Sequence, residues 1–413
     1  MVMNDSEHLN THDDGMTRPQ DDDTARPQDD GGKPPTVLQI LPALGGSGGV
    51  ERGTVEIAGA INAAGGRALV ASEGGLLVHD LTRVNAEHFT LPVASKNPLV
   101  MYRNIDRLVR LIRREHVDVV HVRSRAPAWS AYIACQRTNI PFVTTFHGTY
   151  SIGNWLKRKY NAVMTFGDRV IAISTFIGGH IRRHYGVPVD KIRVIHRGVD
   201  LERFDPEKVS AERVIKLSTE WRLPDGVPII MLPGRLTRWK GQLVLIDAIA
   251  SLGRKDIRCL LVGSPQGRED YRRELEKRIT HHGLEEVIRI VDHCDDMPAA
   301  YKLTDLVVSA STDPEAFGRV VCEAQAMGRP VIASDHGGSR ETVLPDITGW
   351  LTPPGDVEAL SKALEIGLSL DNPARRKLAD IAIEHVRKNF SKNQMCDKTL
   401  EVYNEVLAAR GRA

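Results

Sequence analysis

The sequence has few cysteines, few aromatic residues and no long hydrophobic run. Its 413 residues include five scattered cysteines and no Cys-x-x-Cys pair, which argues against structural zinc and fits a reducing compartment. Aromatic residues make up 5% of the chain and are not interleaved with basic residues, which argues against nucleic-acid binding. Without a run of about 18 apolar residues or an apolar N-terminal core, we expect neither a transmembrane helix nor a signal peptide. These absences predict a cytoplasmic protein.

Charge is unevenly distributed along the chain. The formal net charge is +2, but residues 1–35 hold nine acidic and three basic residues, a net of −6, which leaves +8 for the remainder. This segment repeats Arg-Pro-Gln-Asp-Asp at 18–22 and 26–30 and has almost no large apolar residues. It is therefore predicted to be a disordered acidic tail.

From residue 36 onward, short apolar segments alternate with helical stretches. Near-continuous apolar runs joined by helices are typical of parallel strands covered on both faces. A polar, irregular segment at 201–226 is interpreted as a linker. The sequence thus predicts an α/β protein with two Rossmann-like domains, 36–205 and 206–390, whose parallel sheets face each other across a cleft. The expected strands are 36–41, 67–72, 117–122, 141–146, 169–174 and 192–196, then 228–234, 257–263, 287–291, 305–311 and 330–334.

The C-terminus is predicted to be helical, at about 357–368, 375–389 and 391–409. In the last helix, Cys396, Leu400, Tyr403 and Leu407 follow at spacings of four, three and four, which indicates one buried stripe with Val406 at its edge. Residues 391–413 are treated as a separate C-terminal segment.

Two glutamates dominate the segment 312–343. Glu315 and Glu323 stand eight positions apart, with Phe317 and Gly318 between them. The run 318–327 is predicted to be a helix that ends at Gly328, before an apolar strand. Glu315 then lies in the loop before this helix and Glu323 in its second turn.

A helix that begins at this point presents free backbone amides to the preceding loop. Such amides bind anions, and phosphate in particular. A carboxylate beside a phosphate site repels the ligand unless the carboxylate binds hydroxyl groups instead. A sugar nucleotide offers both a diphosphate and hydroxyls. The amides concerned are those of Arg319, Val320 and Val321.

Cations at a strand end provide a second clue. Arg235 and Lys240 follow the first strand of the second half. The departing diphosphate of a sugar nucleotide gains charge as its bond to the sugar breaks, so a metal or fixed cations must stabilise it. No Asp-x-Asp string stands at a strand end to hold a metal, and both cations can bind phosphate, so no metal or other cofactor is expected.

In the first half, His147 ends an expected strand and precedes a glycine. The run Gly45 to Gly49 opens the first helix, as a tight turn or as a close backbone approach to a ligand. Its spacing does not fit Gly-x-Gly-x-x-Gly, and no Walker A string occurs, so a nicotinamide site is unsupported.

Segment 312–343, together with these motifs, resembles the signature of family-4 retaining glycosyltransferases, which have the GT-B fold. The resemblance covers about 36–410 and points to bacterial enzymes that build lipopolysaccharide or other envelope polysaccharide. It implies a nucleotide-diphosphate sugar as co-substrate, a glycan or lipid-linked acceptor, and a closing helix that returns onto the first domain. It also implies front-face attack without a covalent nucleophile.

The resemblance further implies a role for each residue. Arg235 and Lys240 stabilise the diphosphate, and His147 contacts the donor sugar. Glu315 binds the transferred sugar, whose hydroxyls are held by backbone amides around Phe317 and Gly318. Glu323 binds the ribose hydroxyls, and the Gly48–Gly49 loop approaches donor and acceptor. An asparagine is often found in this family where Arg197 stands, which leaves Arg197 without an implied role.

Two alternatives remain open from the sequence. A nucleotide-sugar 2-epimerase on the same fold would need no acceptor. A non-catalytic sugar-nucleotide binding protein would bind the donor without turnover.

One amphipathic segment has two interpretations. In residues 100–116, four arginines share one helical face opposite apolar residues. The face is either solvated or adsorbs to anionic lipid, helped by Trp155 and the basic residues 157–159, on the inner face of the membrane. The arginines are Arg103, Arg107, Arg110 and Arg114.

Overall fold

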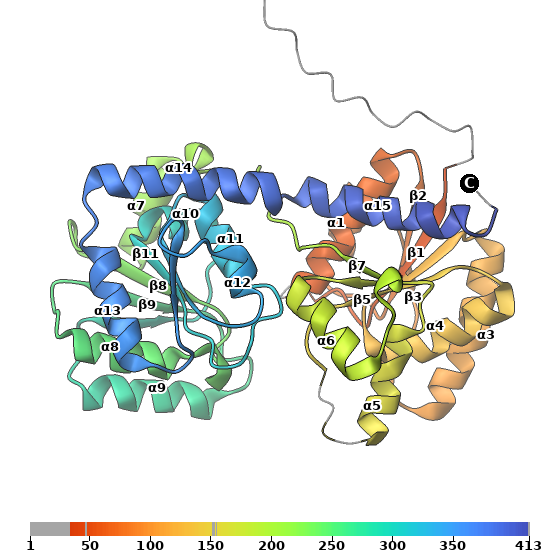
Figure 1. The fold of residues 1–413 in the computed structure, drawn as a ribbon, viewed down its shortest axis with the longest axis horizontal. Helices are drawn as coiled ribbons and strands as arrows, with labels where there is room; N and C mark the ends of the chain where they lie inside the picture. The colour runs from red at the N-terminus through yellow and green to blue at the C-terminus, as the bar shows by residue number, and fades with distance from the viewer. Residues whose placement is uncertain (1–33, 46–47, 151–152, 154, 412–413) are drawn as a thin grey trace, which may run out of the picture.

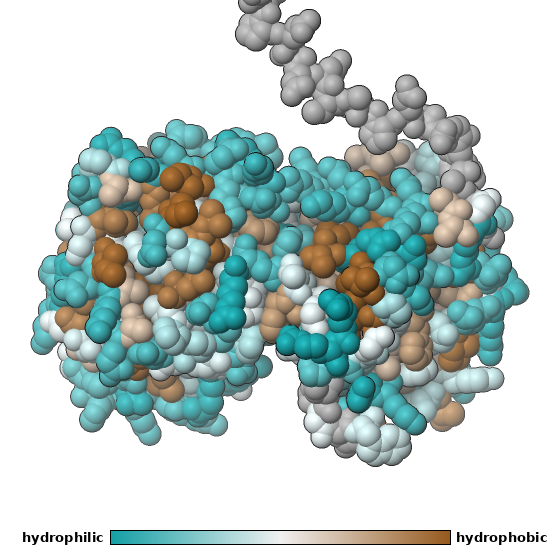
Figure 2. Space-filling view, viewed as in Figure 1, coloured by the Kyte–Doolittle hydropathy of each residue, from teal (hydrophilic) through white to brown (hydrophobic). Residues whose placement is uncertain are grey.

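The computed structural model describes residues 34–45, 48–150, 153 and 155–411. The predicted tail up to residue 33, and residues 46 and 47 of the glycine run, lie outside the described residues. Figure 1 shows two lobes side by side, each a sheet flanked by helices. Figure 2 shows a notch between the lobes at the lower edge of the same view.

The first lobe contains a parallel sheet in the order β3-β2-β1-β4-β5-β6-β7. β1 lies in the interior, where Leu38 pairs with Leu69 on one side and Val120 on the other. All five β1 residues are buried, as expected for a strand covered on both faces. The strands are β1 Thr36–Ile40, β2 Arg67–Ser72, β3 Glu87–Thr90, β4 Val119–Val122, β5 Phe142–Phe146, β6 Arg169–Ala172 and β7 Ile192–Val194. The helices are α1 Gly49–Ala63, α2 Val78–Arg83, α3 Pro98–Arg114, α4 Arg125–Thr138, α5 Trp155–Ala162 and α6 Thr175–Tyr185.

The second lobe repeats this architecture with the order β10-β9-β8-β11-β12-β13, again parallel where strands pair. The strands are β8 Ile229–Pro233, β9 Arg258–Val262, β10 Ile288–Val291, β11 Leu306–Ser309, β12 Val331–Ser334 and β13 Gly349–Thr352. The helices are α7 Ala211–Glu220, α8 Gln242–Leu252, α9 Glu269–His281, α10 Met297–Leu303, α11 Arg319–Ala326, α12 Ser339–Thr342, α13 Val357–Leu368 and α14 Asn372–Asn389. The predicted α/β class with two Rossmann-like sheets is confirmed.

Three local expectations were wrong or incomplete. Segment 201–226 is not an irregular linker throughout, because it contains α7, which is capped by Ser210 and packs against α10. Within α7 only Leu217 is buried, too little to give an apolar period in the sequence. Strands β3 and β13 were not predicted, because both are edge strands without a continuous apolar run.

The last helix, α15 (Lys392–Ala408), crosses from the second lobe to the first. Figure 1 shows α14 along the second lobe and α15 continuing over the first. The crossing is fixed where the Val199 amide bonds Phe390 O at 2.8 Å and the Lys392 amide bonds Val199 O at 2.9 Å. Tyr403 is fully buried, and its hydroxyl lies 2.7 Å from His121 Nδ1. Helix α15 thus packs on the first lobe, where Val406 is buried as well.

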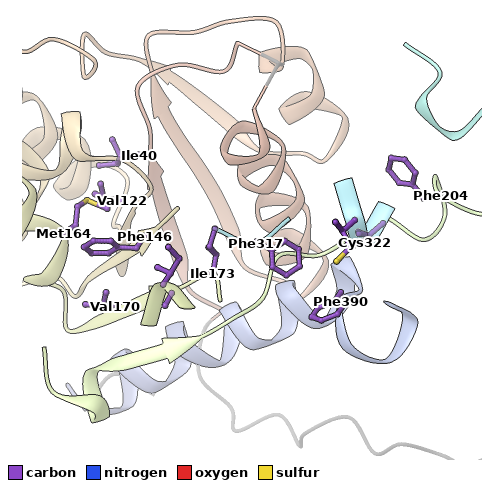
Figure 3. Close-up of a cluster of buried hydrophobic side chains, with 14 of the residues drawn as sticks. Ile40, Val122, Phe146, Met164, Val170, Ile173, Phe204, Phe317, Cys322 and Phe390 are labelled. Carbon is purple, nitrogen blue, oxygen red and sulfur yellow. The ribbon is translucent and has the colours of Figure 1, made fainter. Parts of the chain in front are cut away.

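One hydrophobic cluster joins the lobes. Figure 3 shows Phe146 and Ile173 of the first lobe in line with Phe317 and Phe390. The rings of Phe317 and Phe390 meet edge to face, with centroids 5.6 Å apart. The segment between the two predicted glutamates is thereby anchored at the lobe junction.

Candidate active site

The loop that carries Glu315 is shaped by glycines. Gly318 adopts φ +86° and is the N-cap residue of α11, a left-handed conformation that favours glycine. A Cβ on Gly337 would lie 2.4 Å from Glu315 O, and one on Gly338 would lie 2.4 Å from Phe317 Cα. The glycine pair after β12 is therefore needed so that this segment can pack against the Glu315 loop.

The amides at the start of α11 partly match the prediction. The amides of Arg319 and Val320 have no backbone acceptor within the described part of the chain. The Val321 amide, however, donates to Gly318 O at 3.0 Å, so the expectation that it is free was wrong. Gly318 is the N-cap residue, and its carbonyl accepts the first hydrogen bond of the helix. Two amides thus remain for an anion.

Lys240 and Glu315 are brought together. Lys240 ends the short 3-10 turn after β8, and its Nζ lies 2.5 Å from Glu315 Oε1. Ser311 Oγ donates to the same oxygen at 2.6 Å. The two side chains are 15% and 13% exposed, so water screens the pair only weakly. The structure therefore places cation and carboxylate in one compact group.

Arg235 lies apart from this pair. It follows β8 and is exposed, and no hydrogen bond or ion pair holds its guanidinium among the described residues. Its backbone carbonyl accepts from Gln242 Nε2 at 3.0 Å, which fixes the turn but leaves the side chain available.

Glu323 is buried and already has two partners. Its Oε1 lies 2.8 Å from Arg319 Nε, and its Oε2 accepts from Tyr301 OH at 3.1 Å. Burial, together with the charge of Glu323, raises the pKa of Tyr301 well above its ordinary value, so this hydroxyl stays protonated and donates. Tyr301, which the sequence did not single out, therefore orients the carboxylate.

On the first lobe, His147 is held by Arg197. Arg197 Nη2 lies 2.7 Å from His147 Nδ1, and Arg197 Nη1 donates to Gly49 O. Burial first, then the charges of Arg197 and Arg123 and the ring of His121, hold the pKa of His147 well below its ordinary value. His147 is therefore neutral at pH 7. Arg197 is a site residue that sequence reasoning left without a role.

The glycines that open α1 are approached by side chains. A Cβ on Gly48 would lie 2.1 Å from Glu51 Oε2, and one on Gly49 would lie 2.5 Å from Arg197 Nη1. The same position on Gly49 lies 3.4 Å from Arg319 Nη1, which belongs to the other lobe. A donor contact at Gly48 and Gly49 stays a prediction; in the structure the two positions face the ends of the Glu51 and Arg197 side chains.

Hydrogen bonds of Ser174 and of Glu341 join the two lobes next to the Glu315 loop. Ser174 Oγ donates to Ala316 O at 2.6 Å, and the Glu341 carboxylate accepts from the amides of Thr175 and Phe176 at 2.7 Å each. His196 Nε2 lies 2.8 Å from Glu341. Burial opposes the charge on Glu341, but these hydrogen bonds prevail and lower its pKa. Glu341 lies in the segment 312–343, yet nothing in the sequence showed that it caps α6 of the other lobe.

Metal and membrane features can be stated for the described residues. No group of three or more His, Cys, Asp and Glu side chains among them is arranged to hold a metal ion. Metal independence stays a prediction. Nor does any helix in the described ranges combine the length and apolarity that crossing a bilayer requires.

Known glycosyltransferases match this chain in sequence and in fold. Residues 47–203 match the model of Glycosyltransferase Family 4, and residues 215–385 match Glycosyl transferases group 1. A glycosyltransferase of known structure from Rickettsia africae is 40% identical, with a TM-score of 0.84 over 90% of this chain and 98% of its own. Anabaena HepE, solved with UDP and glucose, is 24% identical, with a TM-score of 0.78 over 90% of this chain and 99% of its own. A curated D-inositol 3-phosphate glycosyltransferase from Xylanimonas cellulosilytica is 29% identical and covers 71% of this chain and 73% of its own length.

The two sheets and these matches define a glycosyltransferase. The chain belongs to the family-4 glycosyltransferases with the GT-B fold.

Proposed function

We propose that this enzyme transfers a sugar from a nucleotide-diphosphate sugar to a glycan or lipid-linked acceptor of the cell envelope, with retention of configuration and without a metal. The Lys240–Glu315 pair beside the free amides of Arg319 and Val320 carries the proposal. These groups combine donors for phosphate with an acceptor for hydroxyls, which are the two chemistries of a sugar nucleotide.

The proposed reaction follows from this arrangement. The bond from the sugar anomeric carbon to the phosphate oxygen breaks, and the acceptor oxygen bonds to that carbon on the same face. The departing phosphate oxygen takes the acceptor's proton. Lys240 and Arg235 stabilise the charge that grows on the phosphate. Glu315 and His147 hold the sugar, and Glu323 holds the ribose.

The envelope assignment concerns the acceptor. It is supported by the resemblance to envelope enzymes and by the basic face of α3. In the structure, Ile105, Leu108 and Ile112 of α3 are buried, whereas Arg103, Arg110 and Arg114 are exposed. Nearby, Leu99 is 72% exposed, and on α5 Trp155 is 64% exposed beside three exposed basic residues. Exposed apolar side chains among cations are typical of surfaces that adsorb to anionic lipid.

A substrate screen tests the proposal. Thermal stabilisation by a panel of UDP, GDP and ADP sugars identifies the donor. Transfer is then measured by mass spectrometry with envelope glycan precursors and with D-inositol 3-phosphate as acceptors, and the anomeric configuration of the product by NMR. Transfer only to inositol phosphate would contradict the envelope acceptor, and a product of inverted configuration would contradict retention. Isomerised nucleotide sugar formed without acceptor would contradict sugar transfer itself.

A further inference from the structure

In the hydrogen bond between Arg197 and His147, only Arg197 can be the donor. A guanidinium carries N–H donors and no acceptor, so Arg197 Nη2 donates and His147 Nδ1 accepts across 2.7 Å. A neutral imidazole that accepts at Nδ1 carries its proton on Nε2. His147 Nε2 is buried and has no hydrogen-bond partner among the described residues. The ring therefore holds an unused donor.

Arg197 is itself held in place on the first lobe. Its second nitrogen, Nη1, donates to Gly49 O at the start of α1, and the absence of a Cβ on Gly49 makes room for it. No carboxylate of the described residues pairs with Arg197. Its partners are thus a carbonyl and an imidazole, both of which can only receive its protons in this geometry.

We propose that Arg197 is a positioning residue that fixes His147 in the Nε2–H tautomer, so that the ring donates a hydrogen bond to a hydroxyl of the donor sugar. This inference rests on the proposed function in that a sugar occupies the cleft. It excludes His147 as a general base at Nε2, because that nitrogen already carries the proton. It also keeps a positive charge away from the anomeric carbon, which becomes electron-poor in the transition state.

The charged groups around the ring support this assignment. The groups that face the His147 ring are Arg197 after β7 and, at the end of β4, Arg123 and His121. If Nδ1 of His147 were also protonated, its N–H would point at the N–H of Arg197, and the imidazolium and guanidinium cations would be in contact. Burial, and then repulsion from Arg319 and Arg123, lowers the pKa of Arg197 to about 9, so the guanidinium stays charged at neutral pH.

The test compares Arg197→Gln with Arg197→Lys. Glutamine can donate or accept, so it no longer dictates the tautomer, whereas lysine remains a donor-only cation. Arg182→Gln on α6 is the matched control, since it removes an exposed positive charge without touching His147. Nitrogen-15 NMR of the full chain labelled at histidine reports which ring nitrogen carries the proton, and His147→Gln assigns the signal.

We expect a protonated Nε2 in the wild type, the control and Arg197→Lys, and a mixture with protonated Nδ1 in Arg197→Gln. A wild-type ring protonated on Nδ1, or an unchanged tautomer in Arg197→Gln, would overturn the inference. This readout needs neither donor nor acceptor. If no nucleotide sugar is turned over, the proposed function therefore fails while the tautomer assignment stands.

A pH profile adds a readout that a purely structural role would not change. In Arg197→Gln, the pKa of His147 should rise, although burial and Arg123 still lower it, so the acidic limb of kcat/KM should move to higher pH. In the wild type and in Arg197→Lys, where a cation still faces the ring, this limb should lie at lower pH. Weaker UDP binding in Arg197→Gln with identical pH profiles would show that Arg197 is a phosphate ligand instead.

Discussion

Replacing Lys240 by alanine separates catalysis from stability. Negative charge grows on the leaving diphosphate only as the glycosidic bond stretches, so the ammonium helps the transition state more than the bound donor. Losing one such electrostatic donor should lower kcat by about 10²–10³-fold, or roughly 3–4 kcal/mol. The donor KM should change much less.

The structure adds a stability cost to this substitution. Lys240 pairs with Glu315, and both side chains are more than four-fifths buried. Removing one partner leaves a poorly solvated carboxylate, which should lower the free energy of unfolding by about 2–4 kcal/mol. The backbone should stay in place, because the Thr312 amide bonds Trp239 O at 2.8 Å independently of the side chains.

The double variant Lys240→Ala, Glu315→Gln distinguishes the two effects. It removes the unpaired charge, so urea unfolding should recover most of the lost stability, while kcat should stay low because the cation is still missing. Glu323→Gln is the comparison variant. The ribose hydroxyls that Glu323 is proposed to bind do not change charge during transfer, so the loss of this carboxylate should appear mainly as a higher donor KM. Kinetics use the donor found in the nucleotide-sugar screen. The reasoning is refuted if Lys240→Ala raises only KM, or if the double variant regains kcat.

Three further predictions concern metal, pH and lipid. EDTA should leave transfer intact, and loss of activity that manganese or magnesium restores would contradict this. Glu341→Gln should lower the free energy of unfolding by about 1–3 kcal/mol at pH 7. Because the pKa of Glu341 is lowered in the folded state, its stabilisation is present above the ordinary value of 4.5 and is lost as pH falls through the folded value. Urea unfolding of the wild type should thus lose this contribution as pH falls below the ordinary value of 4.5, and a Glu341→Gln curve parallel to the wild type in that range would refute the assignment. Changing Arg103, Arg107, Arg110 and Arg114 to glutamine should weaken cosedimentation with phosphatidylserine vesicles and spare donor binding; unchanged cosedimentation would leave α3 a solvated helix.

Much of the fold could be predicted because its signals are local. Interior parallel strands such as β1 and β8 are apolar on both faces, so each appears as a short continuous run. Helix α11 was located by the glycines on either side of it, and the structure places it at Arg319–Ala326. The edge strand β3 and helix α7 bury too little apolar surface to leave such a signal, and both were missed.

The candidate site was predicted residue by residue but not contact by contact. The chemistry of Lys240, Glu315 and His147 and their positions after strands were readable, because side-chain type and strand end are local properties. Their partners were not. Lys240 meets Glu315 across 75 positions, and Arg197 meets His147 across 50.

Those partnerships depend on strand order and on how the lobes close. Parallel strands bring their carboxyl ends to one edge whatever their separation in sequence, so β5 and β7 can both deliver residues to one point. Glu341 caps a helix of the other lobe only because the closed lobes bring it next to the amides of Thr175 and Phe176 and to His196. The sequence by itself determined the elements and the kinds of groups at their ends. Only the tertiary structure decided which of these groups are paired, because pairing is a property of distance in space and leaves no period in the chain.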